Sequence, residues 1–464
     1  MDKRDYKFVS SGNAQMDQIL NGGFPANSLN IIMGQPGTGK TVFAEQMVFY
    51  HARENDRPIL YLTTLSEPLS KVLTYLQRFS FFDQEKVNTA VQYQDIGFEL
   101  AQSGVGALQK KIYEAIHEIS PKIIVIDSFR ALHDLIESPK ELRQMLHELT
   151  STLTAYETTV FLVGEYTEKQ SNLAPEFAIA DGIVEFLRNP LSTRDERFVR
   201  VLKLRGSSYH EGMHGFRVTS DGLEIFPRLV SPPESTAYTV DNERVSSGIT
   251  GLDKLLDGGF LKGSTCLLAG PTGSGKTTAA LQFAIDGVRK GEASLYVNFQ
   301  ENPSQLARSI SNLGADYEQL VKDGLHLYYM SPVELQIDSI VVKIFSLIGA
   351  LGVKRIVVDA VGDLITAAVD ANRIHDYLYS LNQAFSAKGV TTILTFETLG
   401  GITGTSLNMN GERFSYMADS VILLNVNVKG ERKRTLAIVK QRASAHDLSL
   451  HEMRIARDGV RILD

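Results

Sequence analysis

The sequence predicts an α/β protein of two tandem domains, each a mostly parallel, twisted sheet with helices on both faces and a C-terminal β-hairpin. Three observations predict this fold class. The chain repeats itself once, apolar runs alternate with amphipathic helical stretches, and each copy closes on a glycine-containing turn between β-rich runs. Continuous apolar strands indicate a sheet buried on both faces, which is typical of parallel sheets.

The internal repeat consists of segments that match in the same order along both copies. Each copy is far longer than a solenoid unit and is therefore a whole domain. We predict a first domain at 1–230, a linker with a Pro-Pro pair at 231–245, and a second domain at 246–464. The matching pairs are 10–24 with 246–260, 34–41 with 270–277, 59–68 with 294–303, 123–128 with 356–360, 203–210 with 440–446, and 216–226 with 453–463.

The predicted strands are short β-rich runs bounded by turns or helical stretches. A hairpin closes each copy, with turns at 220–222 and 457–459 in which glycine supplies the positive φ. The runs lie at 28–33, 59–63, 123–127, 159–164, 182–187 and 198–204 in the first copy, and at 265–269, 294–299, 325–330, 355–359, 391–396, 420–426 and 435–440 in the second.

Composition excludes several classes of protein. With 43% hydrophobic and 22% charged residues and a net charge of −7, the chain is of ordinary globular type and not basic enough for constitutive nucleic-acid binding. The single Cys266 lies in an apolar run and is expected to be a buried strand residue in a reducing cytosol. No apolar run is as long as a membrane span, so we expect a cytoplasmic protein without membrane contact.

The motif G-x-x-x-x-G-K-[ST] occurs twice, as GQPGTGKT and GPTGSGKT, each time between an apolar run and a helical stretch. Its glycines let the backbone wrap around phosphates, with N–H groups pointing inward at a helix N-terminus. Lys40 and Lys276 would reach the β- and γ-phosphates, and Thr41 and Thr277 would hold Mg²⁺. The sequence therefore predicts two nucleoside triphosphate sites.

Acidic residues at strand ends complete the expected chemistry. Asp127 and Asp359 end matching apolar runs, where a carboxylate orients Mg²⁺ through water. Hydrolysis also needs a carboxylate that positions the attacking water, and Glu301 is the best candidate for this role and for a metal contact. Its neighbour Gln300 can orient a water but cannot accept its proton. Glu67 in the first copy is displaced by one position, and a solvated glutamate before a helix stays open as the alternative.

A Lys-x-Arg pair ends a strand late in each copy, as Lys203 with Arg205 and Lys440 with Arg442. An isolated pair of this kind is usually a solvated feature of an edge strand. Both copies place the pair at the same point, and two cations two residues apart share a face of the strand. This arrangement suits a γ-phosphate clamp or an arginine finger donated across a subunit interface.

Together these motifs resemble the KaiC-like family of RecA-type P-loop ATPases, over residues 7–464. The resemblance implies two tandem RecA-like domains in a double-ring homohexamer, with ATP and Mg²⁺ between subunits and an unidentified protein partner. The residues implied in phosphate binding within a subunit are Gly37, Thr38, Gly39, Lys40, Thr41 and Val42, and Gly273, Ser274, Gly275, Lys276, Thr277 and Thr278. Those implied across the interface or beside the nucleotide are Lys203, Leu204, Arg205, Ser207, Tyr209, Thr219 and Ser220, and Lys440, Gln441, Arg442, Ser444 and His446.

Departures from the family pattern bear on activity. The family's paired catalytic glutamates are replaced by Leu65-Ser66 and by Gln300-Glu301. The autophosphorylation pair of the clock proteins falls on Ser415-Tyr416, so only Ser415 is retained, and their C-terminal tail is expected to be absent. The sequence therefore predicts a weak ATPase with residual serine autokinase activity, acting as a nucleotide-dependent switch and not as a circadian phosphorylation cycle.

Two other functions stay open. A scaffold that binds ATP without hydrolysing it agrees with the replaced glutamates. A DNA-acting recombinase or helicase of RecA type needs basic or glycine-rich loops in a ring channel, and the segments at that place are 165–181 and 397–419. The glycines of the second segment keep this alternative open, although the net charge makes nucleic acid an unlikely partner.

Overall fold

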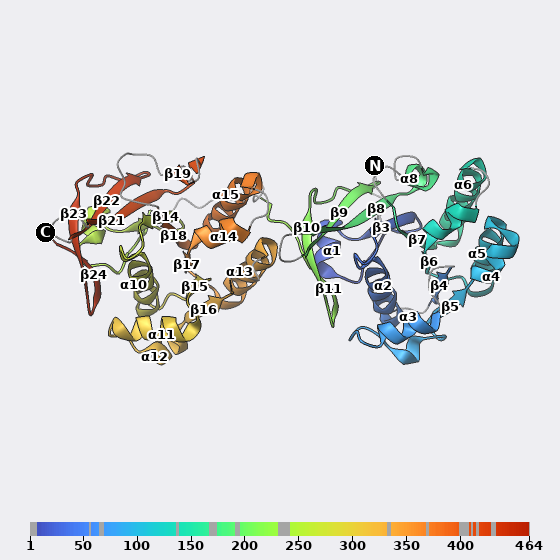
Figure 1. The fold of residues 1–464 in the computed structure, drawn as a ribbon, viewed down its shortest axis with the longest axis horizontal. Helices are drawn as coiled ribbons and strands as arrows, with labels where there is room; N and C mark the ends of the chain where they lie inside the picture. Colours follow the sequence, from blue (N-terminus) through green and yellow to red (C-terminus); the bar gives the residue numbers. More distant parts are fainter. Residues whose placement is uncertain are drawn as a thin grey trace. The chain divides into compact units, whose positions relative to one another are not determined.

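The structure is a computed structural model. Its chain divides into two compact units, Met1–Arg228 and Leu229–Asp464. Figure 1 shows the chain as a ribbon. Among the described residues, no helix is long and apolar enough to cross a membrane. The structure describes residues 7–54, 57–64, 69–135, 139–166, 174–190, 195–230, 242–331, 336–367, 371–398, 408–409, 412–413, 417–427 and 433–463.

The first unit is built on one large sheet. Its described strands lie in the order β11 (Gly222–Phe226), β10 (His214–Thr219), β9 (Asp195–Leu204), β8 (Gly182–Pro190), β3 (Leu29–Gly34), β7 (Thr159–Gly164), β6 (Ile123–Asp127), β4 (Ile59–Thr63) and β5 (Val91–Asp95). Neighbours from β8 to β5 pair in parallel, and neighbours from β8 to β11 pair antiparallel.

The second unit repeats this topology strand for strand. Its described strands lie in the order β24 (Gly459–Ile462), β23 (His451–Ala456), β22 (Lys433–Gln441), β21 (Ser420–Asn427), β14 (Thr265–Gly270), β18 (Thr391–Glu397), β17 (Arg355–Asp359), β15 (Ser294–Asn298) and β16 (Leu325–Tyr329). The predicted fold class is confirmed, including the closing hairpins, whose turn residues Gly222 and Gly459 have φ of 100° and 107°.

Helices cover both faces of each sheet (Figure 1). In the first unit these are α1 (Ala14–Ile19), α2 (Lys40–Glu54), α3 (Leu69–Leu76), α4 (Gly97–Ser103), α5 (Val105–Ile119), α6 (Pro139–Tyr156) and α8 (Pro175–Ile179), with the 3₁₀ turns η1 (Gln84–Lys86) and η2 (Phe129–Leu135). In the second unit they are α9 (Leu252–Leu255), α10 (Lys276–Arg289), α11 (Pro303–Asn312), α12 (Tyr317–Asp323), α13 (Ile337–Leu351), α14 (Val361–Ala367) and α15 (Ala371–Ala387).

The core follows from the alternation of side chains along the central strands. Neighbouring residues of a strand point to opposite faces, so Ile32 of β3 packs with Phe43 of α2 while Ile31 packs with Ile112 of α5 and Leu146 of α6. All of these side chains are nearly or fully buried. Two apolar layers therefore hold the carboxyl ends of the strands at one edge of each sheet, where the sequence motifs lie.

Sequence patterns missed the edge strand β5 and the small ladders. Strand β5 reads VQYQD, and only Val91 and Tyr93 are buried, so it has no continuous apolar run to reveal it. The two-residue strands pair far-separated backbone and carry no periodic signal. They are β1 (Phe8–Val9) with β2 (Phe24–Pro25), β12 (Arg244–Val245) with β13 (Phe260–Leu261), and β19 (Asn408–Met409) with β20 (Glu412–Arg413).

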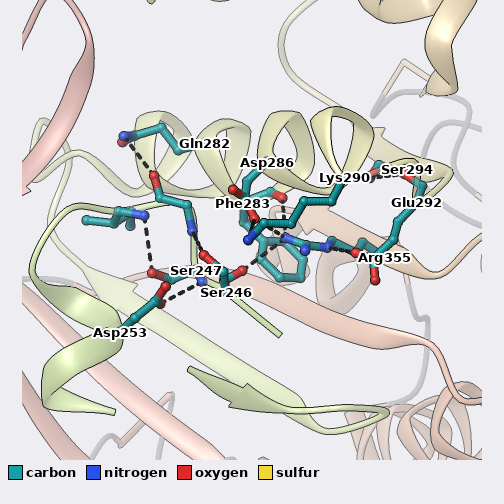
Figure 2. Close-up of polar contacts among 12 residues, drawn as sticks. Ser246, Ser247, Asp253, Gln282, Phe283, Asp286, Lys290, Glu292, Ser294 and Arg355 are labelled. Carbon is teal, nitrogen blue, oxygen red and sulfur yellow. Dashed lines mark hydrogen bonds and ion pairs between the residues drawn. The ribbon is translucent and has the colours of Figure 1, made fainter. Parts of the chain in front are cut away.

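A buried arginine joins three segments of the second unit (Figure 2). Arg355 begins β17, and its side chain is only 2% exposed. Its guanidinium donates to the carbonyl oxygens of Ser246 and Phe283, each at 3.0 Å, and forms ion pairs with Asp286 and Glu292. Because each N–H group needs a partner when buried, these contacts tie the segment before α9 to α10 and to the central sheet.

The first unit makes the same connection with a different side chain. His51 of α2 donates from Nε2 to the carbonyl oxygen of Ser10 at 2.8 Å, at the place that matches Ser246. The residue that matches His51 is Gly287, where a Cβ would lie 2.5 Å from Cδ of Arg355. The two copies therefore hold the same backbone carbonyl by an imidazole in one case and by a guanidinium in the other.

Candidate nucleotide sites

The first phosphate loop joins β3 to α2. Gly39 has a φ of 100° and is followed by the first residue of α2, Lys40, so the helix begins inside the motif. Nζ of Lys40 and Oγ1 of Thr38 both donate to the carbonyl oxygen of Gln35, each at 2.8 Å. Burial lowers the pKa of Lys40. The loop thus presents a helix N-terminus and one largely buried ammonium group to the same space.

The second phosphate loop has the same form between β14 and α10. Gly275 has a φ of 102°, and α10 begins at Lys276. Nζ of Lys276 donates to the carbonyl oxygens of Gly270 at 2.8 Å and Pro271 at 3.0 Å. Burial lowers the pKa of Lys276 as well. Both predicted loops therefore take the conformation that binds phosphate groups.

The threonine of each motif lies against the aspartate at the end of the neighbouring strand. In the first unit, Oγ1 of Thr41 donates to Oδ2 of Asp127 at 2.9 Å, and the Tyr61 hydroxyl donates to the same oxygen at 3.0 Å. Burial raises the pKa of Asp127, and the bonds from Thr41 and Tyr61 act in the opposite direction. A hydroxyl and a carboxylate beside a phosphate loop form the oxygen donor set that suits Mg²⁺.

The second unit repeats this contact. Oγ1 of Thr277 donates to Oδ2 of Asp359 at 3.0 Å, and the Tyr296 hydroxyl donates to it at 2.7 Å. Thr395 donates to the other carboxylate oxygen. The tyrosine was not predicted as a site residue, although Tyr61 and Tyr296 occupy matching positions in ILYLTT and SLYVNF. This match between the two copies could have identified the tyrosine from the sequence.

An open cleft of about 880 Å³ lies over the first phosphate loop. Its lining includes Arg197 of β9, which the sequence predictions did not include. Arg434 of β22 occupies the matching position, and its Nε donates to the carbonyl oxygen of Gly273 in the second loop at 3.1 Å. Each arginine lies six residues before the lysine of its Lys-x-Arg pair, so a comparison of the two copies could have identified both of them.

Each unit also places a glutamate at the end of the strand beside the phosphate loop. Oε1 of Glu165, directly after β7, lies 3.9 Å from Nζ of Lys40 and lines the first cleft. Glu397, the last residue of β18, accepts a hydrogen bond from Oγ1 of Thr272 in the second loop. Neither glutamate was among the predicted site residues.

The candidate catalytic pair of the second unit follows β15. Nε2 of Gln300 donates to Oδ2 of Asp363 at 3.1 Å. The backbone N–H of Glu301 donates to Oδ1 of Asn298, and its carboxylate Oε2 is buried without a hydrogen-bond partner among the described residues. Burial, followed by the negative charge of Asp359, raises the pKa of Glu301. This carboxylate has one free oxygen and a raised proton affinity, the properties of a general base.

Two predicted residues lie outside the part of the chain that the structure describes. Glu67, the candidate carboxylate of the first copy, belongs to the segment 65–68. Ser415, the candidate phosphorylation site, belongs to the segment 414–416. Of the two segments weighed as DNA-binding loops, residues 167–173 of the first and residues 399–407, 410–411 and 414–416 of the second also lie outside the described ranges. These assignments stay predictions.

The Lys-x-Arg pairs contact the segments that precede β8 and β21. Nζ of Lys203 donates to the carbonyl oxygens of Phe177 and Ala178, both at 3.1 Å, and Arg205 donates to that of Ala178 at 3.0 Å. Burial lowers the pKa of Lys203. Neither cation is among the described residues that line the cleft of its own unit.

The second pair is held in the same way. Nζ of Lys440 donates to the carbonyl oxygen of Ala418 at 2.6 Å, and Arg442 lies 3.5 Å from the carboxylate of Asp419. Burial lowers the pKa of Lys440. More than half of the Arg442 side chain is exposed, at 55%, so its guanidinium can reach a neighbouring molecule.

The other predicted contacts of the first unit lie near its closing strands. Leu204 is buried in the core at the end of β9, and Tyr209 packs against the same core. Oγ of Ser207 donates to the carbonyl oxygen of the next residue at 3.0 Å. Thr219 and Ser220 form the hairpin turn, where Oγ1 of Thr219 donates to the backbone at 3.1 Å. None of these five residues lines the described cleft of this unit.

In the second unit the corresponding residues follow β22. Nε2 of Gln441 donates to the carbonyl oxygen of Leu256 at 3.1 Å, and Oγ of Ser444 lies 3.4 Å from Oδ2 of Asp257. Nε2 of His446 is buried without a partner among the described residues. The segment therefore packs on the start of its own unit and carries one ring nitrogen that is free to accept or donate.

A buried acid lies near Asp127 in the first unit, at a position where the second unit has no acid. The carboxyl of Glu45, on α2, is fully buried and accepts a hydrogen bond from the Tyr93 hydroxyl at 2.6 Å. Burial raises the pKa of Glu45 to about 8, and the charge of Asp127 acts in the same direction. The matching residue in the second unit is Leu281, so the surroundings of Asp127 and Asp359 differ.

Comparison with known proteins agrees with these two sites. The family model for the KaiC ATPase matches residues 9–230 and again 245–464. The circadian clock oscillator protein KaiC of Picosynechococcus sp. is 28% identical over 462 residues, which cover 97% of this chain and 88% of that protein. KaiC 1 of Synechocystis sp. is 28% identical over 97% of this chain and 87% of its own length, and KaiC of Parathermosynechococcus lividus is 28% identical over 98% and 85%.

Proposed function

This chain belongs to the KaiC family of ATPases, and from that premise we propose that it is an ATP-dependent switch with slow, Mg²⁺-dependent ATPase activity. In this proposal the domains at 1–230 and 246–464 form the two rings of a homohexamer, with ATP bound between neighbouring subunits. The assembly reports its nucleotide state to a protein partner, and Ser415 is the residue that residual autokinase activity would modify.

One observation carries the proposal: both units repeat the contact between phosphate-loop threonine and strand-end aspartate. Thr41 lies 2.9 Å from Asp127, and Thr277 lies 3.0 Å from Asp359. A glycine turn alone does not require this pair of oxygen donors, whereas Mg²⁺ bound to a triphosphate does. When bound, Mg²⁺ would neutralise phosphate charge, while the loop N–H groups and lysines position the phosphates.

In this proposal, the cations of the two Lys-x-Arg pairs contact the ATP bound to a neighbouring subunit. Lys203, Arg205, Lys440 and Arg442 lie on backbone carbonyls or beside an aspartate of their own unit. These contacts of partly exposed groups contribute little to stability, so the side chains can exchange them for phosphate oxygens of a neighbouring subunit. This exchange would make assembly depend on nucleotide.

Substitution of Lys276 by alanine tests the second site. Because the variant loses the ammonium group that reaches the phosphates, bound nucleotide should fall by about half, since the first site remains. Native mass spectrometry with and without ATP and Mg²⁺ would give subunit number and bound nucleotides together. Lys290→Ala, at the residue that caps the C-terminus of the same helix, is the matched control. Nucleotide content unchanged from wild type in Lys276→Ala would refute the assignment.

A second function, an ATP-bound scaffold without turnover, is favoured by one specific observation. Leu65 and Ser66 replace the family's catalytic glutamates in the first copy, and Gln300 replaces one of them in the second. In such a scaffold ATP would only join subunits, and hydrolysis would not exceed the uncatalysed rate. Phosphate release measured on the assembled protein separates the two proposals.

A further inference from the structure

The first phosphate loop lacks a carboxylate in the place where the second unit has Glu301, because the matching positions hold Leu65 and Ser66. We propose that Glu165 supplies the missing group. Its carboxylate orients the water that attacks the γ-phosphate at the first loop and accepts the proton of that water. This inference rests on the proposed ATPase function and names the residue that performs it in the first unit.

The strand order places Glu165 at the edge of the sheet where the phosphate loop lies. The residue directly follows β7, which lies between the phosphate-loop strand β3 and the strand β6 that ends in Asp127. Gly164 is level with Met33, and Val163 is level with Asp127. The carboxyl ends of neighbouring parallel strands meet at one edge, which is where such sheets bind ligands.

The geometry places this carboxylate on the γ-phosphate side of the cleft. Oε1 of Glu165 lies 3.9 Å from Nζ of Lys40, which is the group that reaches the β- and γ-phosphates. The Glu165 side chain is 53% exposed, so water can approach it, while that of Lys40 is only 8% exposed. Both residues line the cleft together with Thr41.

The other carboxylate that lines this cleft, among the described residues, already has a different task. Asp127 accepts hydrogen bonds from Thr41 and from Tyr61 on Oδ2, as a residue that orients Mg²⁺ requires. A carboxylate committed to the metal site is poorly placed to take a proton from water. Glu165 is the other acid among the described residues that line this cleft, and its carboxylate lies beside Lys40.

The second unit has an acid at both matching positions, after β15 and at the end of β18, and there the acid of β18 is the one held by the phosphate loop. There Glu397 matches Glu165, but its carboxylate accepts a hydrogen bond from Thr272 of the phosphate loop. The residue that matches Thr272 is Pro36, which has no hydroxyl to hold Glu165. In the second unit the carboxylate with an unpaired oxygen is therefore Glu301, after β15, whereas in the first unit the half-exposed Glu165, after β7, lies beside Lys40.

The chemical step balances with groups already named. The water oxygen forms a bond to the γ-phosphorus as the bond from that phosphorus to the β–γ bridging oxygen breaks. One water proton passes to the Glu165 carboxylate and from there to the released phosphate or to solvent. The products are ADP and inorganic phosphate, and no oxidant or further reactant is needed.

The test compares Glu165→Gln with its parent in the full-length chain that also carries Lys276→Ala, so that only the first loop is loaded. A glutamine keeps the size of the side chain but cannot accept a proton, so ADP formation in a single turnover should fall at least about tenfold. Nucleotide released from the denatured protein and separated by chromatography should show undiminished total binding, with a higher fraction of ATP.

Two further variants distinguish failure of the inference from failure of the proposed function. Glu118→Gln, an exposed glutamate on α5, controls for the substitution itself, and Glu67→Gln tests the competing acid. Undiminished ADP formation in Glu165→Gln, or a loss seen only in Glu67→Gln, overturns the inference while the ATPase function stands. A parent chain that binds ATP without forming ADP overturns both the inference and hydrolysis at this site. A parent that binds no nucleotide overturns the proposed function itself.

Discussion

At the scale of single residues, the two candidate nucleotide sites share the residues that we expect to contact phosphate and metal, but they differ in the buried groups behind them. Lysine, threonine, aspartate and tyrosine recur at matching positions, and the distances between them agree within a few tenths of an ångström. Glu45 has no acidic counterpart, because Leu281 takes its place. The first site alone therefore carries a buried proton near its metal ligand.

This proton makes the stability of the first unit depend on pH. The pKa of Glu45 is about 8 in the folded chain, so between pH 5 and 8 the unfolded chain loses a proton that the folded chain keeps. Stability therefore falls as pH rises, by up to about 1.4 kcal/mol per pH unit, and becomes flat above the folded pKa.

Glu45→Gln should remove that dependence while keeping the hydrogen bond with Tyr93. Urea denaturation followed by circular dichroism at pH 5.5 and 8 should show a gain in stability at pH 8 that shrinks at pH 5.5. The exposed Glu114→Gln should follow the wild-type profile. If Glu45→Gln also keeps that profile, the buried carboxyl is not the group that titrates.

At the scale of elements, strands buried on both faces were predicted to within a few residues, as were the partly exposed β9, β16 and β22, whereas the edge strand β5 and the two-residue strands were missed. Runs such as IIVID and TVFLVG are continuous and apolar because helices cover both of their sides. The edge strand β5 alternates polar and apolar residues, and the small ladder of β12 with β13 is held by contacts between distant segments. No local pattern encodes such contacts.

Arg355 is the main example of an element fixed by a side chain. Arg355→Met should lower the stability of the second unit by about 2–4 kcal/mol, because Asp286 and Glu292 lose their common partner. Lys290→Met, which removes a half-exposed partner of the same Asp286, should cost less than about 1 kcal/mol. Equal unfolding midpoints for the two variants in urea would show that the cluster does not hold the segment before α9.

At the scale of the whole molecule, the proposed assembly depends on the partly exposed cations of the Lys-x-Arg pairs. Arg442 is 55% exposed and Arg205 is 54% exposed, at matching places in the two units. The contacts that these half-exposed side chains make within their own unit contribute little to the stability of the monomer, so we expect the main effect of removing either one on contacts between molecules.

Arg442→Ala should therefore weaken turnover or assembly at the second ring without unfolding the chain. An arginine finger typically contributes about 10³–10⁵ to the rate, so a fall of at least about tenfold is expected if hydrolysis is measurable. Native mass spectrometry, phosphate release and circular dichroism check the three properties, with the exposed Arg454→Ala as control. Wild-type assembly and turnover would rule out the role across subunits.

The amino-acid sequence by itself determined the duplication, the mostly parallel sheet of each copy, both phosphate loops and both strand-end aspartates. These features depend on local chemistry: an apolar run, a glycine turn, and an acid or a lysine at a set spacing. Only the tertiary structure decided that Glu165 lies beside Lys40, that Arg197 and Arg434 reach the loops, and that Arg355 replaces His51. Such contacts join residues far apart in the chain, and packing in three dimensions brings them together, which no spacing along the sequence records.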